Sequence, residues 1–456
     1  IQFVEQKDFL NVAILHSLWE KLGMNSTFPH SNSKRISTAQ IAEILTIAKL
    51  IRPSSNLQTI NWLKRTCLPE ILGISIQNYN RMKIFNELDL IQENSQKIEE
   101  QLMCYSKKSG EDQFEIYFVD GTTSFFEGTN CSLGKKGKDK TNGYKTHMIL
   151  IMLVTNQKGY PCAWEVFSGD KKEVSEFKGV IDRISKNYNI ANTTFCFDRG
   201  FASSGNFNVI EGLNAKFISG LNSDQIEKVF DIKAFQNTRT KLLEKTSSEV
   251  KHASKPSTRK VPINGFYTAD NERFYKELGH KKEGYRHVVG FSSEIYYAES
   301  KSRENSLHQT LLEINALNDD LANAKRDRDL DVTERTLEEI IKKYKMTKII
   351  SFSIVPVKLM NRKKALQSGK ICIKVNTNEF RKASYLDGLF VYVTDHIEKS
   401  KNGGQYTLSA YDLIMHYKNK YIIEKDFRDL KNVIDIRPMF VRLPQHVKAV
   451  VTICMM

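Results

Sequence analysis

The sequence predicts an α/β fold: a mixed sheet covered by helices, with a helical domain before it and a long mixed α+β insertion within it. Runs with strand character follow one another and then alternate with helical patterns, which is typical of such a sheet. Before this region, apolar residues recur at helical spacing. After it, the composition shifts and the alternating pattern then returns. These changes divide the chain into 1–110, 111–222, 223–380 and 381–456.

Residues 1–110 are expected to form the helical domain. Thr38 can cap a segment whose apolar residues recur at helical spacing, and Pro53 ends that segment. The same pattern recurs over 88–105. A small helical domain with basic edges could bind DNA or simply pack against the rest of the chain. No recognition helix can be identified.

The sheet is expected to begin with a strand over 114–119 that becomes fully apolar just before Asp120. A short buried strand over 193–197 ends in the same way at Asp198. A helix is expected over 173–185, because its apolar residues share one face. Further strands are expected at 145–155, 161–167 and 216–221.

The insertion, 223–380, is expected to be mixed in character. Residues 236–261 are polar and basic and should be exposed, whereas 285–298 has β character. The run 303–345 lacks Gly and Pro, and Asp331 followed by Glu334 could cap the second helix of a hairpin. That hairpin could contact a partner subunit or be a solvated helical pair. Strands are expected at 349–357 and 371–375.

The last part, 381–456, returns to the α/β pattern. It has a strand over 389–394 and helical character from 409 to 432. An apolar helix should begin near Val447, and we expect it to be truncated at Met456. The chain also begins without Met, which points to a natural N-terminus further upstream.

Charge favours a polyanionic partner. Sixty-eight Lys and Arg against 53 Asp and Glu give a net charge of +15. Neutralising phosphates releases counterions and drives binding to nucleic acid, although many other soluble proteins are basic. The segment 134–138 lacks the spacing of a phosphate-binding loop, so no nucleotide cofactor is expected. We interpret it as a solvated loop, with a DNA-facing loop as the alternative.

Composition also argues against several classes of protein. The seven cysteines are odd in number and form no C-x2-C pair, which argues against a disulfide framework and against structural zinc. No apolar run reaches the roughly 18 residues that a membrane-spanning helix needs. The chain does not open with a secretory signal. We therefore expect a cytoplasmic protein without a membrane segment.

Two acids follow apolar strands. Asp120 precedes Gly121, and Asp198 precedes Arg199 and Gly200, so each taken alone is typical of a turn at a strand end. Neighbouring strand ends would instead place both carboxylates within reach of one divalent cation. Hard cations prefer such oxygen ligands.

A third acid lies on a polar helix face. Tyr417, Lys420, Glu424 and Lys431 fall within an arc of roughly 60° if the helix is continuous. The face could be solvated, with an (i, i+4) pair between Lys420 and Glu424. Alternatively, Lys420 and Lys431 would bind the DNA phosphates beside a scissile bond, and Tyr417 could donate a hydrogen bond to one of them.

Together the three acids predict a metal site for phosphoryl transfer. Asp120, Asp198 and Glu424 would hold two Mg²⁺ ions about 4 Å apart, with Mn²⁺ as a substitute. Such a site activates a water or a 3′-hydroxyl and stabilises the leaving oxygen.

The chain resembles DDE transposases of bacterial insertion sequences, in the branch whose third acid lies in a Y-x2-R-x3-E-x6-K signature. Residues 417–431 match that signature, with Lys420 where Arg is usual; Lys keeps the charge but lacks the planar fork of Arg. Residues 117–123 and 197–201 are similar to the segments that carry the first two acids. The similarity reaches back to 18–23 and so covers nearly the whole chain.

This resemblance implies a ribonuclease H-like core with a long insertion before the third acid. It also implies Mg²⁺-dependent cleavage of double-stranded DNA at transposon ends, followed by transfer of the 3′-hydroxyl ends into target DNA by a homodimer. In the bacterial cytoplasm, the DNA-bound protein would be associated with the nucleoid. Two alternatives remain: a decayed or domesticated DNA-binding protein of the same fold, and a metal-dependent nuclease that does not join strands.

Overall fold

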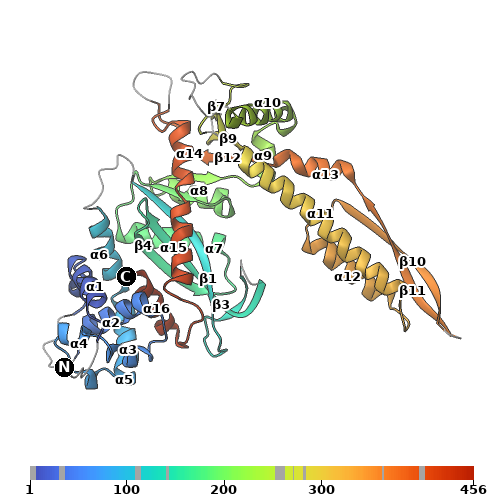
Figure 1. Ribbon diagram of the computed structural model, residues 1–456. Helices are drawn as coiled ribbons and strands as arrows, with labels where there is room; N and C mark the ends of the chain where they lie inside the picture. Colours follow the sequence, from blue (N-terminus) through green and yellow to red (C-terminus); the bar gives the residue numbers. More distant parts are fainter. Residues whose placement is uncertain are drawn as a thin grey trace. The chain divides into compact units, whose positions relative to one another are not determined.

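The computed structural model divides the chain into two compact units (Figure 1). The first unit comprises Ile1–Gly220 and Val393–Met456, and the second comprises Leu221–Tyr392. Within the described residues, no helix combines the length and the apolar character needed to cross a bilayer. The structure describes residues 7–29, 36–107, 115–139, 143–251, 262–270, 272–280, 284–361, 364–399 and 406–456.

The four-part division made from the sequence stays a prediction. Its first boundary, at residue 110, lies outside the described residues. The expected insertion, 223–380, falls inside the second unit, which extends to Tyr392.

The first unit opens with helices. The helix α2 begins with a capping box between Ser37 and Gln40, so Ser37, and not Thr38, is its cap. The expected helical segment over 88–105 is two helices that part at Asn94, whose side chain binds the carbonyl of Leu90. The elements are α1 (Leu10–Lys21), η1 (Met24–Thr27), α2 (Thr38–Ile51), α3 (Thr59–Leu63), α4 (Leu68–Ile71), η2 (Ile76–Asn78), α5 (Arg81–Glu93) and α6 (Ser95–Lys107).

A mixed sheet forms the centre of the first unit. β1 pairs antiparallel with β3 and parallel with β5, and β5 pairs parallel with β6. On its other side β3 pairs with β2 and β4. This arrangement confirms the predicted α/β, ribonuclease H-like fold class. The strands are β1 (Ile116–Phe125), β2 (Lys135–Asp139), β3 (Gly143–Asn156), β4 (Pro161–Ser168), β5 (Thr194–Phe197) and β6 (Lys216–Gly220).

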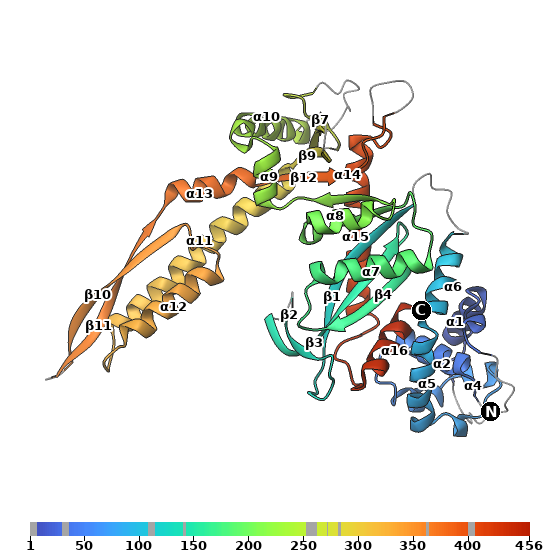
Figure 2. The same ribbon diagram turned by 180° about the vertical axis from the view of Figure 1, so that it is seen from behind.

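Helices cover both faces of this sheet. Both views show α7 (Glu173–Asn187) and α8 (Ser204–Glu211) on one face, and α14 (Ala410–Lys418) and α15 (Tyr421–Asn432) on the other (Figures 1 and 2). A cluster of phenylalanines fills the α7–α8 side, where apolar burial stabilises the sheet. Its members are Phe177, Phe197, Phe201, Phe207 and Phe217.

The expected apolar helix near the end of the chain is α16 (Pro444–Met455). It begins three residues before Val447 and is buried from His446 onward except at Lys448. It packs against α2, α5 and β4, which joins the N-terminal helices to the sheet.

The second unit contains a smaller sheet and a long helical layer. Its strands follow the order β12-β9-β8-β7. Separately, β10 and β11 form a two-stranded antiparallel sheet. The elements are α9 (Ser223–Val229), α10 (Ile232–Lys251), β7 (Tyr267–Thr268), β8 (Arg273–Gly279), β9 (Arg286–Ser292), α11 (Ser293–Ala322), α12 (Leu330–Lys343), β10 (Ile350–Asn361), β11 (Lys364–Val375), α13 (Thr377–Ala383), η4 (Ser384–Leu386) and β12 (Leu389–Thr394), which continues into the first unit.

Three predictions in these regions are wrong. The stretch from residue 236 is not exposed throughout, because Thr238, Leu242 and Thr246 of α10 are buried; residues 252–261 lie outside the described part. The β character expected over 285–298 ends at Ser292, whose side chain caps α11. The segment 134–138 is mostly the strand β2, because it pairs with β3.

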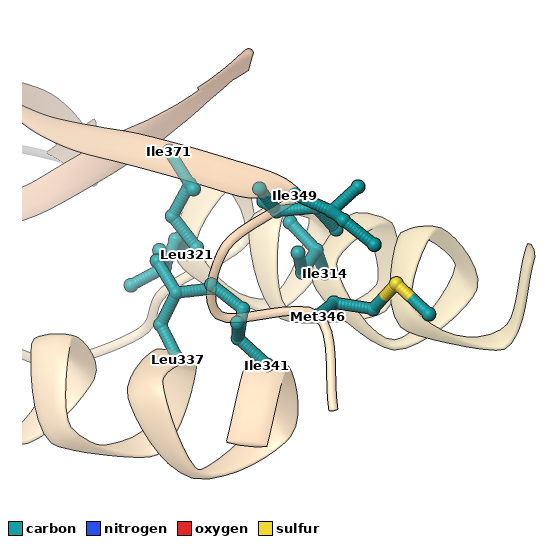
Figure 3. Close-up of a cluster of buried hydrophobic side chains, with 8 residues drawn as sticks. Ile314, Leu321, Leu337, Ile341, Met346, Ile349 and Ile371 are labelled. Carbon is teal, nitrogen blue, oxygen red and sulfur yellow. The ribbon is translucent and has the colours of Figure 1, made fainter. Parts of the chain in front are cut away.

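The predicted helical hairpin is present as α11 and α12, and Asp329, rather than Asp331, caps α12. These helices and the β10–β11 sheet enclose a buried apolar cluster (Figure 3). Burial of these side chains away from water holds α11, α12 and the β10–β11 sheet together. The cluster consists of Ile314, Leu321, Leu337, Ile341, Met346, Ile349, Ile350 and Ile371.

Candidate active site

Strand register places Asp120 and Asp198 side by side. Val119 of β1 is the partner of Phe197 in the parallel strand β5, and each acid is the next residue of its chain. Asp198 follows the end of β5, as expected. The prediction for Asp120 is partly wrong: it lies in the middle of β1, because the antiparallel pairing with β3 continues to Phe125.

The side chain of Asp120 faces α14 and α15. Successive residues of a strand point to opposite faces. A Cβ added to Gly121 would lie 2.8 Å from the side chain of Glu173, at the start of α7, so Gly121 faces the α7 side. Asp120 therefore projects from the opposite face, where it is only 8% exposed.

Lys420 lies among the three predicted acids. Its ammonium nitrogen is 3.7 Å from Oδ2 of Asp120 and 3.3 Å from Oε1 of Glu424, and the residue is only 5% exposed. Burial by itself lowers the pKa of Lys420, but the negative charges of Asp120, Asp198 and Glu424 outweigh burial and raise it above its ordinary value. The structure buries Lys420 within the acidic cluster, and its predicted contact with a DNA phosphate stays a prediction.

Tyr417 reaches the second acid. Its hydroxyl donates a hydrogen bond of 3.1 Å to Oδ1 of Asp198, which also accepts from the amide of Arg199. The expected continuous helix is interrupted here: α14 ends at Lys418 and α15 starts at Tyr421. The intervening residues keep right-handed helical angles, so Tyr417 and Glu424 still approach the same site.

Gly220 makes room for this hydrogen bond and was missed by sequence reasoning. It ends β6, the strand next to β5. A Cβ added to Gly220 would lie only 2.9 Å from the Tyr417 hydroxyl oxygen. The signal was present in the sequence, since the expected strand at 216–221 is a third apolar strand, and its glycine follows the apolar run.

Glu424 and Lys431 are both on α15, and Glu424 joins the cluster through its ion pair with Lys420. The Glu424 side chain is 58% exposed and extends from its ion pair with Lys420 toward solvent. Lys431 is seven residues further along, or about 10 Å along the helix axis, and is half-buried. Its predicted phosphate contact stays a prediction.

The donor set of this cluster suits a hard divalent cation. Three carboxylates gather around one positive charge, and carboxylate oxygens are the ligands that Mg²⁺ prefers. Within the described part of the chain, no group of three His, Cys, Asp or Glu side chains is already positioned to hold a metal ion. Lys420 neutralises Asp120 and Glu424 in this arrangement.

Solved structures with some likeness are transposases. The piggyBac transposase synaptic complex with hairpin DNA is 9% identical, with a TM-score of 0.30. The match covers 97% of this chain, which spans 64% of the piggyBac chain. The Mos1 transposase paired-end complex with the left transposon end is 12% identical, covers 41% of this chain and 61% of its own, and has a TM-score of 0.18.

The sequence itself carries the assignment. No curated protein matches the chain. The family model described as the transposase DDE domain matches residues 111–456, which include the three acids and both units' strands. This match covers well over half of the chain, which therefore belongs to the transposase DDE domain family.

Proposed function

We propose that this chain is a DNA transposase that cleaves the ends of its element and joins the freed 3′ ends to target DNA. Family membership supports this function. The observation that carries it is the gathering of Asp120, Asp198 and Glu424 around the Lys420 ammonium. Carboxylates arranged in this way suit the binding of divalent metal during phosphoryl transfer.

In this proposal Asp120, Asp198 and Glu424 hold two Mg²⁺ ions, for which Mn²⁺ can substitute. Bound metal supplies the Lewis acidity that activates the attacking hydroxyl and neutralises charge on the phosphoryl group. Tyr417 holds Asp198 in place through its hydrogen bond. Lys431 supplies positive charge for the DNA phosphates, and a homodimer would hold two ends. Lys420 balances the acids until metal binds, and its charge is then available to a phosphate at the site.

The reaction consists of two phosphoryl transfers. In the first, a water attacks a phosphodiester at the element's end, the 3′-oxygen leaves, and a 5′-phosphate remains on the other strand end. In the second, the free 3′-hydroxyl attacks a target phosphodiester and displaces its 3′-oxygen. Positioning of the attacking and leaving oxygens by the site's residues supplies most of the rate enhancement.

The test is cleavage of DNA that carries the element's own ends in Mg²⁺, comparing the wild type with Glu424→Gln. Gln keeps the shape of the side chain and leaves the apolar face of α15 unchanged. Glu211→Gln is the matched control, because Glu211 is an exposed acid at the end of α8, on the opposite face of the sheet. We expect the wild type and Glu211→Gln to cut and join, and Glu424→Gln to bind the ends without cutting.

Three other results would contradict this proposal. If none of the proteins cuts but all bind the ends equally, the chain is a DNA-binding protein of the same fold. If the ends are cut but never joined, it is a nuclease. If Glu424→Gln cuts as fast as the wild type, Glu424 is not a ligand of the catalytic metal.

A further inference from the structure

The two-stranded ribbon β10–β11 differs in charge from the helices that cover it. Residues 346–378, which include the whole ribbon, contain seven basic residues and no Asp or Glu. The helices α11 and α12 together contain ten acidic and five basic residues. The seven basic residues are Lys348, Lys358, Arg362, Lys363, Lys364, Lys370 and Lys374.

One side of the ribbon packs against these helices. Ile350 and Ile371 belong to the buried cluster, and Figure 3 shows Ile371 pointing toward Leu321 from the ribbon. Both views show the ribbon alongside α11 and α12 (Figures 1 and 2). The helices therefore cover the apolar side of the ribbon and leave the other side open.

The opposite side is a ladder of exposed pairs across the two strands, which we call the outer face. It is formed by the pairs Ser351–Lys374, Ser353–Cys372 and Val355–Lys370. Nearer the turn the exposed positions shift by one residue along the strand, and there Lys358 is exposed opposite Gln367. Within the described residues, Lys358, Lys370 and Lys374 form no ion pair with an acid.

Edge lysines can also serve to prevent strand-to-strand aggregation. Protection against aggregation would not require that residues 346–378 contain no Asp or Glu, because acidic side chains repel a second copy of the ribbon equally well. The outer face also exposes an apolar side chain, Val355, to 49%. An acid-free surface with interspersed apolar groups is more typical of a surface that a polyanion covers.

We propose that the outer face of the β10–β11 ribbon, together with Lys358, binds the phosphate backbone of double-stranded DNA. The inference rests on the proposed transposase function and adds a surface formed by residues that the carboxylate site does not use. Lys374 and Lys370 are about 13 Å apart along the strand, and Lys358 lies about 10 Å further toward the turn. A duplex carries one charge per about 1.7 Å, so each lysine meets phosphates in any sequence.

The first measurement is the salt dependence of binding to a short fluorescein-labelled duplex of mixed sequence. The variant Lys358→Gln, Lys370→Gln, Lys374→Gln removes three charges from the ribbon. Its matched control, Lys301→Gln, Arg335→Gln, Lys342→Gln, removes three charges from exposed positions of α11 and α12. Each lost phosphate contact reduces the slope of log K against log salt by about 0.9. We expect a reduction of about 2.7 in the ribbon variant and none in the control.

The second measurement uses wild-type protein and does not depend on any variant folding. Cys372 is an exposed thiol on the outer face, and Cys104, also exposed, lies on α6 of the first unit. The rate of maleimide labelling at each thiol is followed by peptide mass spectrometry, with and without the duplex. We expect DNA to slow labelling of Cys372 several-fold more than labelling of Cys104.

Several results would overturn the inference. If the duplex binds but Cys372 reacts at its free rate and the ribbon variant keeps the wild-type salt slope, the ribbon does not bind DNA, while the transposase proposal survives. If the ribbon variant loses only self-association, the outer face binds a second copy of the chain instead. If the wild type binds no DNA at all, both this inference and the proposed function fail.

Discussion

At the scale of single residues, one buried ammonium balances the acidic cluster. Replacing Lys420 by Gln should remove a positive charge 3.7 Å from the carboxylate of Asp120, which is only 8% exposed. We expect the free energy of unfolding, measured with urea in the presence of a chelator, to fall by about 1–3 kcal/mol. Added Mn²⁺ should stabilise the variant more than the wild type, because metal then supplies the missing charge.

Lys425→Gln is the matched control for this prediction, since Lys425 is an exposed lysine on the same helix, α15. Its free energy of unfolding should change by less than about 0.5 kcal/mol. An equally stable Lys420→Gln protein in chelator would show that the ammonium does not neutralise the cluster.

A second residue-scale prediction concerns Gly220 and Tyr417. The methyl group of Gly220→Ala would lie 2.9 Å from the Tyr417 hydroxyl oxygen and should displace it from Asp198. Gly220→Ala and Tyr417→Phe should therefore slow DNA cleavage to a similar degree. Because both changes remove one interaction, the double variant should be no slower than either single variant. Additive losses would mean that the glycine acts in some other way.

At the scale of elements, the side chain of Asp426 on α15 packs against the turn between β3 and β4. A Cβ on Gly159 of that turn would lie 3.2 Å from both carboxylate oxygens of Asp426. Within the described residues, Oδ2 of Asp426 is buried without a hydrogen-bond partner. Burial, followed by the charge of Asp429, raises the pKa of Asp426 to about 6 from its ordinary 3.8.

This raised pKa predicts a pH dependence of stability. Between about pH 4 and 6 the folded protein binds the carboxyl proton of Asp426 more tightly than the unfolded chain does. Asp426 therefore makes the free energy of unfolding fall as pH rises through that window. Asp426→Asn should be more stable than the wild type near pH 7 by about 1–2 kcal/mol, a figure reduced for partial solvent exposure, and the gain should vanish near pH 4.

Denaturation with urea at several pH values measures this difference. Glu304→Gln, an exposed acid on α11, is the control and should show no such gain. A wild type that gains stability relative to Asp426→Asn between pH 4 and 6 would contradict the prediction.

At the scale of the whole molecule, the two compact units should unfold in separate steps, because multi-unit chains are seldom two-state. Leu337 is fully buried in the cluster of the second unit. Leu337→Ala should cost about 2–5 kcal/mol and lower only one calorimetric transition. Hydrogen exchange should quicken in α11, α12 and β10–β11 and stay unchanged in β1 and β5. Val332→Ala, at a 53% exposed position of α12, should shift neither transition.

Local patterns in the sequence determined many of the helices and strands of this protein, and its family. The apolar run before each acid predicted a strand, and Asp198 does follow β5 directly. The strand over 389–394 has the predicted bounds, and the helix expected over 173–185 extends only to Asn187. These patterns are reliable because alternation and helical spacing record which side of a segment is buried. The order of acids and the final signature also identified the family, which the family match confirms.

Tertiary structure alone decided how those pieces meet. Asp120 lies inside a strand rather than at its end, because β3 pairs beyond the point where β5 stops. Lys420 is buried because carboxylates about 300 and 220 residues earlier in the chain offset the cost of desolvating its charge. Gly220 matters only because Tyr417 lies against it. A sequence pattern reports which face of a segment is buried, but register and charge balance depend on partners that only the folded chain brings together.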